Sequence, residues 1–283
     1  MSVTAAQGFR AAGVRAGLKA SGKPDLALVV NDGPLDTAAG VFTTNRVVAA
    51  PVVWSRQLLA GEEGGQPGRA RAVVLNSGSA NACTGTQGMH DTEATAARTA
   101  GLLGAEPGQI LVCSTGVIGE RIDMPVLLEG VDVAALALAD TSQAGTDAAT
   151  AIMTTDTVSK EDALTVGAGD QGWTIGGMIK GVGMLAPGMA TMLAVITTDA
   201  ALTPQQAQDA LASATARTVN RINSDGCMST NDTVLLLASG ASGTTPSRAE
   251  LDEALTEVMS RLGRRLVADA EGATHDIAIT VSG

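Results

Sequence analysis

Aromatic side chains are nearly absent from this chain of 283 residues. It has no tyrosine, and its only Phe and Trp residues are Phe9, Phe42, Trp54 and Trp173. Because hydrophobic residues still make up 45% of the sequence, the core must be filled by aliphatic side chains and methionine, which pack by interdigitation. A chain of this length can bury a sizeable core, in one large domain or in two.

Positive charge, cysteine and long apolar runs are also scarce. The formal net charge of −11 opposes the basic surface that binding of phosphate groups requires, so we exclude nucleic acid as a partner. The cysteines, Cys83, Cys113 and Cys227, are widely spaced and odd in number, which favours a reducing compartment over a disulfide framework. No apolar run reaches the ~18 residues of a membrane helix, and the N-terminus lacks the pattern of a secretory signal. We therefore expect a cytoplasmic protein with no membrane partner.

Histidine is limited to His90 and His275, which lie far apart in the sequence. The chain also has no Cys-x-x-Cys pair, so neither a Ser/His/Asp triad nor a metal site is expected, and no cofactor is predicted. His90 lies beside Asp91 in a segment that we expect to be a polar surface loop. Cys227 has no histidine beside it and is expected to be a small buried thiol.

Short apolar segments rich in β-branched residues alternate with longer alanine-rich segments of helical period, which is typical of an α/β fold. Strands are expected over Leu26–Val30, Val47–Trp54, Ala72–Asn76, Ile110–Cys113, Thr191–Thr197, Val234–Ala238 and Ile277–Val281. Capping residues and periodicity predict helices over Glu93–Leu103, from Thr203-Pro204 to about Val219, and from Ser247 to about Ala270, with Asp91 or Thr92 as the cap of the first. The simplest arrangement of these elements is two adjacent α/β halves split near the middle of the chain.

The segment Lys180–Thr198 has the most unusual composition. Three glycines and Pro187 precede the strand that is expected to begin at Thr191, so the backbone before it can turn tightly and be held under strain. A loose dinucleotide-binding fingerprint starts at Gly181, but a proline and a strand follow it where the motif requires a helix. Lys180 is followed by glycine and not by the Ser/Thr of a phosphate-binding loop. On the residues alone, Thr191 is an ordinary β-forming residue.

Six stretches of the chain resemble, in the same order, motifs of the ornithine acetyltransferase family, the glutamate N-acetyltransferases of arginine biosynthesis. They are Leu75–Gly85, Cys113–Gly119, Ile152–Thr157, Lys180–Thr198, Asn223–Thr233 and Asp269–Thr274. The resemblance spans nearly the whole chain and implies stacked β-sheets flanked by helices, as in the aminopeptidase/ornithine acetyltransferase superfamily. Members of this family are expected to continue past the point that matches Gly283, so we expect this chain to be shortened at its C-terminal end.

The resemblance implies that the chain cuts itself between Ala190 and Thr191. The products would be an α chain, residues 1–190, and a β chain, residues 191–283. The freed Thr191 would act as the nucleophile. Its own α-amine, with an ordinary pKa of ~7.7–8.0, could accept the proton of its hydroxyl near neutral pH, so that no histidine is needed.

Five further residues match functional positions of the family. Thr115 and Gly116 correspond to the oxyanion hole, which acyl transfer needs to stabilise developing negative charge. Thr154, Lys180 and Glu271 correspond to substrate-binding positions. The Lys180 ammonium would neutralise a substrate carboxylate and lower the pKa of the new amine, and Glu271 would bind the α-ammonium of ornithine or glutamate. Without the resemblance, each residue is typical of an ordinary turn, a surface lysine or a solvated carboxylate.

The implied reaction moves an acetyl group from N2-acetyl-L-ornithine to L-glutamate through acetyl-Thr191. Some relatives also accept acetyl-CoA as donor, and the sequence leaves this open here. The implied assembly is a heterotetramer of two α and two β chains. Two other hypotheses stay open: an aminopeptidase or amidase of the same superfamily that uses the same nucleophile, and a shortened chain without catalytic activity.

Overall fold

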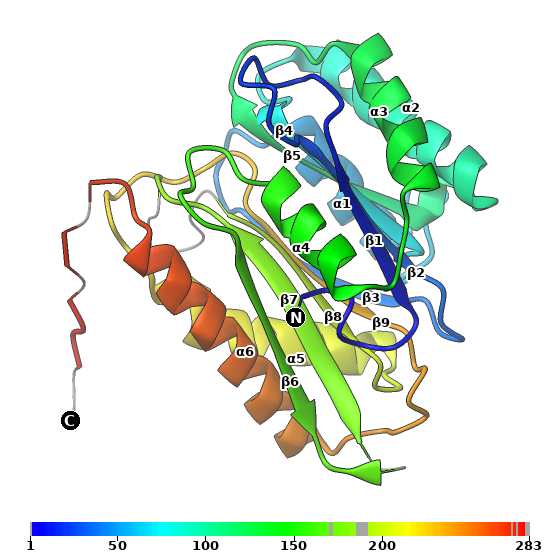
Figure 1. The fold of residues 1–283 in the computed structure, drawn as a ribbon, viewed down its shortest axis with the longest axis vertical. Coiled ribbons are helices and arrows are strands. Elements are labelled where there is room, and N and C mark those ends of the chain that lie inside the picture. Colours follow the sequence, from blue (N-terminus) through cyan, green and yellow to red (C-terminus); the bar gives the residue numbers. More distant parts are fainter. Residues whose placement is uncertain (1, 170–171, 185–191, 273, 276, 281–283) are drawn as a thin grey trace.

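Two mixed β-sheets lie face to face between layers of helices (Figure 1). The computed structural model describes residues 2–169, 172–184, 192–272, 274–275 and 277–280. The first sheet has the strand order β1 (Phe9–Val14), β2 (Leu26–Asn31), β4 (Ala72–Ser79) and β5 (Ile110–Val117). The second has the order β3 (Thr37–Phe42), β9 (Thr233–Ala238), β8 (Leu193–Thr198), β7 (Trp173–Lys180) and β6 (Lys160–Val166). Only the pairs β4–β5 and β8–β9 are parallel among these.

Helices cover the sheets on both sides. The first sheet is packed by α1 (Ala50–Ala60), α2 (Gly85–Leu103), α3 (Met124–Leu136) and α4 (Ser142–Ala151). The second is packed by α5 (Pro204–Arg217) and α6 (Arg248–Ala268), which also contact each other. Short 3₁₀ turns, η1 (Pro107–Gln109) and η3 (Val219–Arg221), lie between elements. Helices α1 to α3 and α5 to α6 form the outer layers, whereas α4 packs on the other face of the first sheet and also contacts β6 and β7 of the second.

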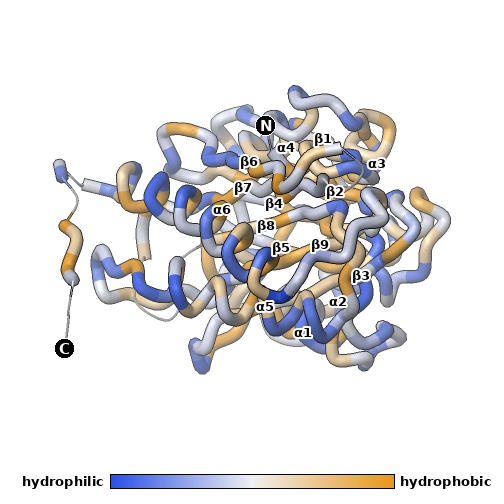
Figure 2. Tube along the Cα trace, turned by 90° about the horizontal axis from the view of Figure 1, so that it is seen from below, coloured by the Kyte–Doolittle hydropathy of each residue, from blue (hydrophilic) through white to orange (hydrophobic). Residues whose placement is uncertain are grey.

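The core follows the two-residue period of the strands. In β8, Leu193 and Val195 pack with the residues of the first sheet, whereas Ala194 and Ile196 pack with α5 and α6. Figure 2 shows the hydrophobic colour gathered along the inner strands and the hydrophilic colour on the outer helices. The expected aliphatic core is thus divided between the space that the two sheets enclose and the space under α5 and α6.

Local signals explain where the last two helices begin. The Thr203 side chain accepts a hydrogen bond from the amide of Gln206, and the Gln206 side chain accepts one from the amide of Thr203. Ser247 and Glu250 form the same reciprocal arrangement at the start of α6. Such capping boxes satisfy amides that have no partner within the helix. The predicted starts of both helices are confirmed.

Four predictions about secondary structure and layout are wrong. Val47–Trp54 is not a strand, because Pro51 opens α1 in the first turn, where no backbone hydrogen bond is lost. The helix expected over Glu93–Leu103 starts earlier, at Gly85, because hydroxyls such as that of Thr92 bond to carbonyls four residues back and are satisfied inside the helix. Residues 277–280 form no strand, and Val281 lies outside the described residues.

The predicted split into two halves near the middle of the chain is also wrong. Strand β3, from the N-terminal part of the chain, pairs with β9 from the C-terminal part. The second sheet therefore mixes segments from both ends of the sequence. Among the described helices, none is long and apolar enough to cross a membrane.

Close packing of α4 on β1 depends on Gly13. A Cβ atom at this position would lie 2.0 Å from the Asp147 carbonyl oxygen and 2.5 Å from the Ala148 amide nitrogen, both in the α4 backbone. Backbone atoms cannot move aside as a flexible side chain can.

We predict that Gly13→Ala lowers the stability by about 1–3 kcal/mol, because the extra methyl group forces α4 away from the sheet. The matched control is Gly101→Ala in α2, where an added Cβ would have open space and where alanine is the better helix former. Thermal unfolding of both variants measures the difference. An unchanged midpoint for Gly13→Ala would contradict the described packing of α4.

Candidate active site

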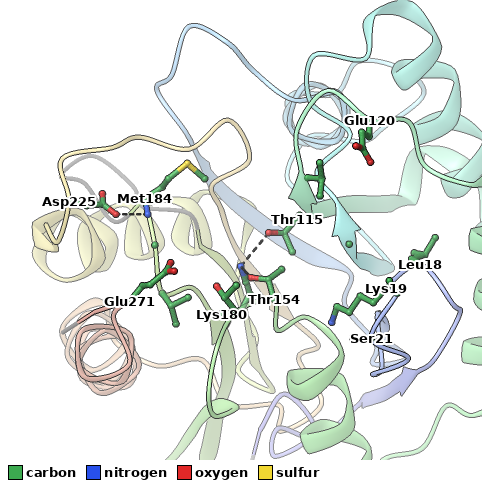
Figure 3. A pocket seen from close by; sticks show the side chains of 17 residues that line it. Leu18, Lys19, Ser21, Thr115, Glu120, Thr154, Lys180, Met184, Asp225 and Glu271 are labelled. Atoms are coloured by element: carbon green, nitrogen blue, oxygen red, sulfur yellow. Dashed lines mark hydrogen bonds between the residues drawn. The ribbon is translucent and has the colours of Figure 1, made fainter. Parts of the chain in front are cut away.

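A cleft of about 820 Å³ opens where the C-terminal ends of β5 and β7 come together (Figure 3). Its walls include Thr115, Gly116, Thr154, Lys180 and Glu271. These five residues, which the sequence resemblance assigned to the oxyanion hole and to substrate binding, come from well-separated parts of the chain. The structure therefore brings them together in one cavity. Ala190 and Thr191 lie outside the described residues.

Lys180 is the buried cation at the centre of this cleft. It is the last residue of β7, and its side chain is only 2% exposed. The ammonium donates hydrogen bonds to the hydroxyls of Thr154, at 2.8 Å, and Thr115, at 3.3 Å. The Asp156 carboxylate lies 4.0 Å away. The lysine expected from the residues alone to be a surface residue is thus buried and held by two side chains of the predicted site.

The environment of Lys180 weakens its hold on its proton. Burial lowers its pKa to about 8, and the positive charges of Lys160 and Lys19 act in the same direction. The negative charge of Asp156 is the main opposing influence, with a smaller contribution from Asp232. At neutral pH the group is therefore still mostly protonated and can attract a carboxylate.

Thr115 and Gly116 lie near the C-terminal end of β5, where the backbone is fixed by close contact with β4. Gly116 has a φ of 134°, and a Cβ there would lie 2.3 Å from the carbonyl carbon of Gly78 on β4, so only glycine fits. The Asn231 side chain, from the segment before β9, donates to the carbonyl of Ser114 at 2.8 Å. The Thr115 hydroxyl accepts from Lys180, and its hydrogen has no acceptor among the described residues. It is free to donate to an oxyanion.

The opposite wall of the cleft carries negative charge. Glu271 follows the end of α6, and its amide donates to the carbonyl of Val182 at 2.7 Å, which places the residue beside the segment after β7. The carboxylate of Asp225 accepts from the amide of Met184 at 2.6 Å. Figure 3 shows Glu271 and Asp225 on one side of the hollow and Lys19 on the other, with Lys180 between them. The cleft therefore offers both signs of charge to a zwitterionic ligand.

Asp232 is a buried carboxyl group that the sequence analysis did not single out. One of its oxygens accepts a hydrogen bond from the amide of Met192 at 3.0 Å, and the other has no hydrogen-bond partner among the described residues. Burial raises its pKa to about 8, against the influence of the Met192 amide and the nearby hydroxyls of Ser229 and Thr43. Met192 is bonded directly to Thr191, so this carboxyl lies next to the predicted cleavage site.

Sequence reasoning also missed the role of Asp156 and Asp269 around Lys180, although both residues lie in stretches that carry the resemblance. The signal was a carboxylate inside each motif, but sequence does not reveal which carboxylates are buried.

Cys227 is exposed, so the prediction of a buried thiol is wrong; it lies in an open loop where Asp225 accepts a hydrogen bond from its amide. His90 is exposed as predicted, but it lies in α2 and not in a loop. No three His, Cys, Asp or Glu side chains in the described part of the chain are grouped as a metal site requires.

Comparison with known proteins first identifies the fold. The L-aminopeptidase/D-Ala-esterase/amidase of Ochrobactrum anthropi, described as a variant of the Ntn hydrolase fold, matches with a TM-score of 0.56 over 96% of this chain and 88% of its own. The two sequences are only 13% identical, so this likeness defines the fold alone. It confirms the predicted α/β class with stacked sheets flanked by helices.

The particular family follows from closer relatives. The ArgJ family model matches residues 10–283. The arginine biosynthesis bifunctional protein ArgJ of Bifidobacterium longum is 58% identical over 100% of this chain and 70% of its own length. The ornithine acetyltransferase of Mycobacterium tuberculosis, solved in complex with ornithine, is 50% identical with a TM-score of 0.62, over 68% of this chain and 96% of the solved chain. The chain belongs to the ArgJ family, and the predicted enzyme class, an acyltransferase, is confirmed at this level.

We predict that the Asp232 carboxyl makes stability depend on pH. Because its pKa is higher in the folded chain than the ~3.9 of a free aspartate, the folded state holds a proton that the unfolded state has lost between about pH 4 and pH 8. Stability therefore falls as pH rises through this window. Asp232→Asn should remove the effect, gaining on the order of a few kcal/mol over the wild type at pH 8 and little at pH 4.

Thermal unfolding at several pH values measures this difference. Glu253→Gln, on the exposed face of α6, is the control and should shift all midpoints alike. If Asp232→Asn destabilised the protein equally at every pH, the carboxyl would be ionised in the folded chain and the described environment would be wrong.

Proposed function

We propose that this chain cuts itself between Ala190 and Thr191 and then uses the freed threonine to transfer acetyl from N2-acetyl-L-ornithine to L-glutamate. The single observation that carries the proposal is the convergence of Thr115, Gly116, Thr154, Lys180 and Glu271 on one cleft. That cleft also contains Met184, just before the segment of the predicted cleavage site. Family membership and the solved relative named ornithine acetyltransferase give the substrate class.

The first step is an acyl shift. The hydroxyl of Thr191 adds to the carbonyl carbon of Ala190, the peptide C–N bond breaks, and the nitrogen takes up the proton to become an amine. Water then hydrolyses the resulting ester, which leaves a carboxylate on Ala190 and restores the hydroxyl of Thr191. The free hydroxyl and the new amine now belong to the same residue.

The second step repeats this chemistry on the substrate. The Thr191 hydroxyl adds to the acetyl carbonyl of acetyl-ornithine while its own amine takes the proton. The Thr115 hydroxyl and the Gly116 amide donate to the developing oxyanion, an effect worth ~10²–10³ in rate for one donor. Ornithine leaves with the proton, and the amine of glutamate then attacks the acetyl ester. This regenerates the hydroxyl and yields N-acetylglutamate.

Charge complementarity supports an amino acid as the ligand. Lys180 supplies the positive charge for a carboxylate, and Glu271 supplies the negative charge for an ammonium group. The Thr154 hydroxyl accepts a hydrogen bond from Lys180 and so holds the lysine ammonium at the cleft wall. Acetyl-CoA as a second donor is a further proposal, which rests on the family resemblance alone.

The architecture supports an α chain of residues 1–190 and a β chain of residues 191–283 that stay together. Strands β6 and β7 precede the cut and β8 and β9 follow it, yet all four lie in one sheet together with β3. Cutting the chain leaves those hydrogen bonds intact. The match to the solved ornithine acetyltransferase covers 68% of this chain but 96% of that one, or about 190 of the 283 residues. This agrees with the length of the proposed α chain.

The resemblance adds an assembly of two α and two β chains and a cytoplasmic location to the proposal. The cysteines Cys83, Cys113 and Cys227 are all free, which is compatible with a reducing compartment.

We predict that Thr191→Ala abolishes both cleavage and acetyl transfer, because the variant has neither the hydroxyl for the acyl shift nor the nucleophile. Denaturing electrophoresis should show two fragments for the wild type and one chain of 28.2 kDa for the variant. Thr165→Ala, on the exposed face of β6, is the matched control and should behave as the wild type. An intact wild-type chain would instead support a non-catalytic role.

The acceptor separates the transferase from a hydrolase. With acetyl-ornithine as donor, release of ornithine should continue only when glutamate is present, and initial-rate plots should give parallel lines. Steady release of ornithine and acetate without glutamate would identify an amidase with the same nucleophile.

A further inference from the structure

A chain of four buried charges extends from the cleft into the protein. Lys160 donates to Asp156 at 2.7 Å and to Asp269 at 2.5 Å, and Asp156 lies 4.0 Å from Lys180. The side chains of Lys160 and Asp156 are fully buried, and those of Lys180 and Asp269 are 2% and 8% exposed. Apart from Lys180, none of these residues has a role in the reaction described above.

Asp156 anchors the backbone beside Lys180 and at Thr154. One oxygen accepts from the amide of Gly181, the residue after Lys180, at 2.7 Å, and also from Lys160. The other oxygen accepts from the amide of Thr154 at 2.9 Å. The backbone on both sides of the Lys180–Thr154 hydrogen bond is therefore anchored to one carboxylate.

Asp269 connects the same cluster to the opposite wall. It follows the last turn of α6, two residues before Glu271, and accepts from Lys160 and from the hydroxyl of Thr157. Both ends of the cluster thus lie beside substrate-binding residues. The charges link the end of β7 to the end of α6 beneath the cleft wall, with Lys180 as the member that lines the cleft.

The balance of charge indicates that Asp156 keeps Lys180 protonated. Burial opposes ionisation of Asp156, but the charge of Lys180 and the bonds from Lys160, Thr154 and Gly181 hold its pKa below the ordinary value. An ammonium buried without an opposite charge loses its proton. Lys180 faces the cations Lys160 and Lys19, and Asp156 is the neighbouring carboxylate that is ionised at neutral pH, because Asp232 holds its proton up to about pH 8.

Stability alone explains the cluster poorly. Buried ion pairs contribute little compared with apolar side chains of the same volume. Here Asp156, Lys160 and Lys180 are buried in a molecule whose core is otherwise mainly aliphatic.

We propose that Asp156 is a positioning residue that fixes the charged Lys180 ammonium between the hydroxyls of Thr115 and Thr154, with Lys160 and Asp269 joining it to the wall that carries Glu271. The proposal rests on the proposed function, because it assumes that Lys180 binds a substrate carboxylate. Asp156 itself touches no substrate in this scheme.

Competitive labelling tests the inference without relying on activity. The rate at which acetic anhydride modifies Lys180, followed against pH by peptide mass spectrometry, reports the pKa of its ammonium. Asp156→Asn should lower that pKa by about 1–3 pH units, because an opposite charge within 4–6 Å is lost. Lys160→Met should raise it, because a like charge is removed. Asp162→Asn, on β6 outside the cleft, is the control and should leave it unchanged.

The two variants should change the pKa of Lys180 in opposite directions, which distinguishes a positioning role from a general loosening of the core. If the substitutions merely opened the core to water, both would raise the pKa of Lys180 toward the 10.5 of a free lysine, and the inference would be overturned. If Asp156→Asn does not fold, as circular dichroism would show, the double variant Asp156→Asn/Lys160→Met, which removes both charges of the pair, is compared with Lys160→Met. The pKa of Lys180 should be lower in the double variant, and an equal or higher pKa overturns the proposal.

Kinetics then test the link to substrate. At pH 7.5 Asp156→Asn should raise KM for glutamate at least about tenfold, with a smaller effect on kcat, and the defect should shrink at pH 6 as Lys180 regains its proton. A lowered pKa with an unchanged KM would uphold the role of Asp156 but refute substrate binding by Lys180. The pKa of Lys180 therefore tests the role of Asp156, and KM separately tests the proposed binding of substrate by Lys180.

Discussion

The buried ammonium of Lys180 is the feature on which the site depends. It lies at the end of β7 in the second sheet and donates to the hydroxyl of Thr115, near the end of β5 in the first sheet, and to that of Thr154, which follows α4. A buried ammonium needs hydrogen-bond acceptors, such as these hydroxyl oxygens, and a nearby carboxylate, and these requirements bring the walls of the cleft together. The hydroxyls of Thr115 and Thr154 and the carboxylate of Asp156 are all arranged around this one group.

The parallel pairs β4–β5 and β8–β9 explain why the cleft lies where it does. The backbone approaches closely at Gly78 and Gly116 near the ends of the first pair, and Met192 and Asp232 lie side by side just before the second. The buried carboxyl group of Asp232, beside the start of β8, lowers the stability of the folded chain as pH rises toward neutral. Such a cost is typical of functional groups, which are retained for their chemistry and not for folding.

The sequence predicted the family, the α/β class, the strands β2, β4, β5, β8 and β9 but not β1, β3, β6 or β7, the starts of α5 and α6, and the five residues that meet in the cleft. It failed where a pattern has two structural solutions. Val47–Trp54 is apolar enough for either element, and only the position of Pro51 at a helix start decides. It also failed where burial determines chemistry, because nothing in the local residues around Asp156, Asp232 or Asp269 distinguishes a buried carboxylate from a solvated one. The pairing of β3 with β9, far apart in sequence, was equally invisible to local patterns.

Intact-mass measurement after brief mixing with acetyl-ornithine, in the absence of glutamate, tests the central claim most directly. The account predicts two fragments, with the mass of one acetyl group added to the fragment that begins Thr-Met-Leu-Ala and lost again when glutamate is added. An uncleaved chain that still turns over substrate, or an acetyl group on any other residue, would contradict it.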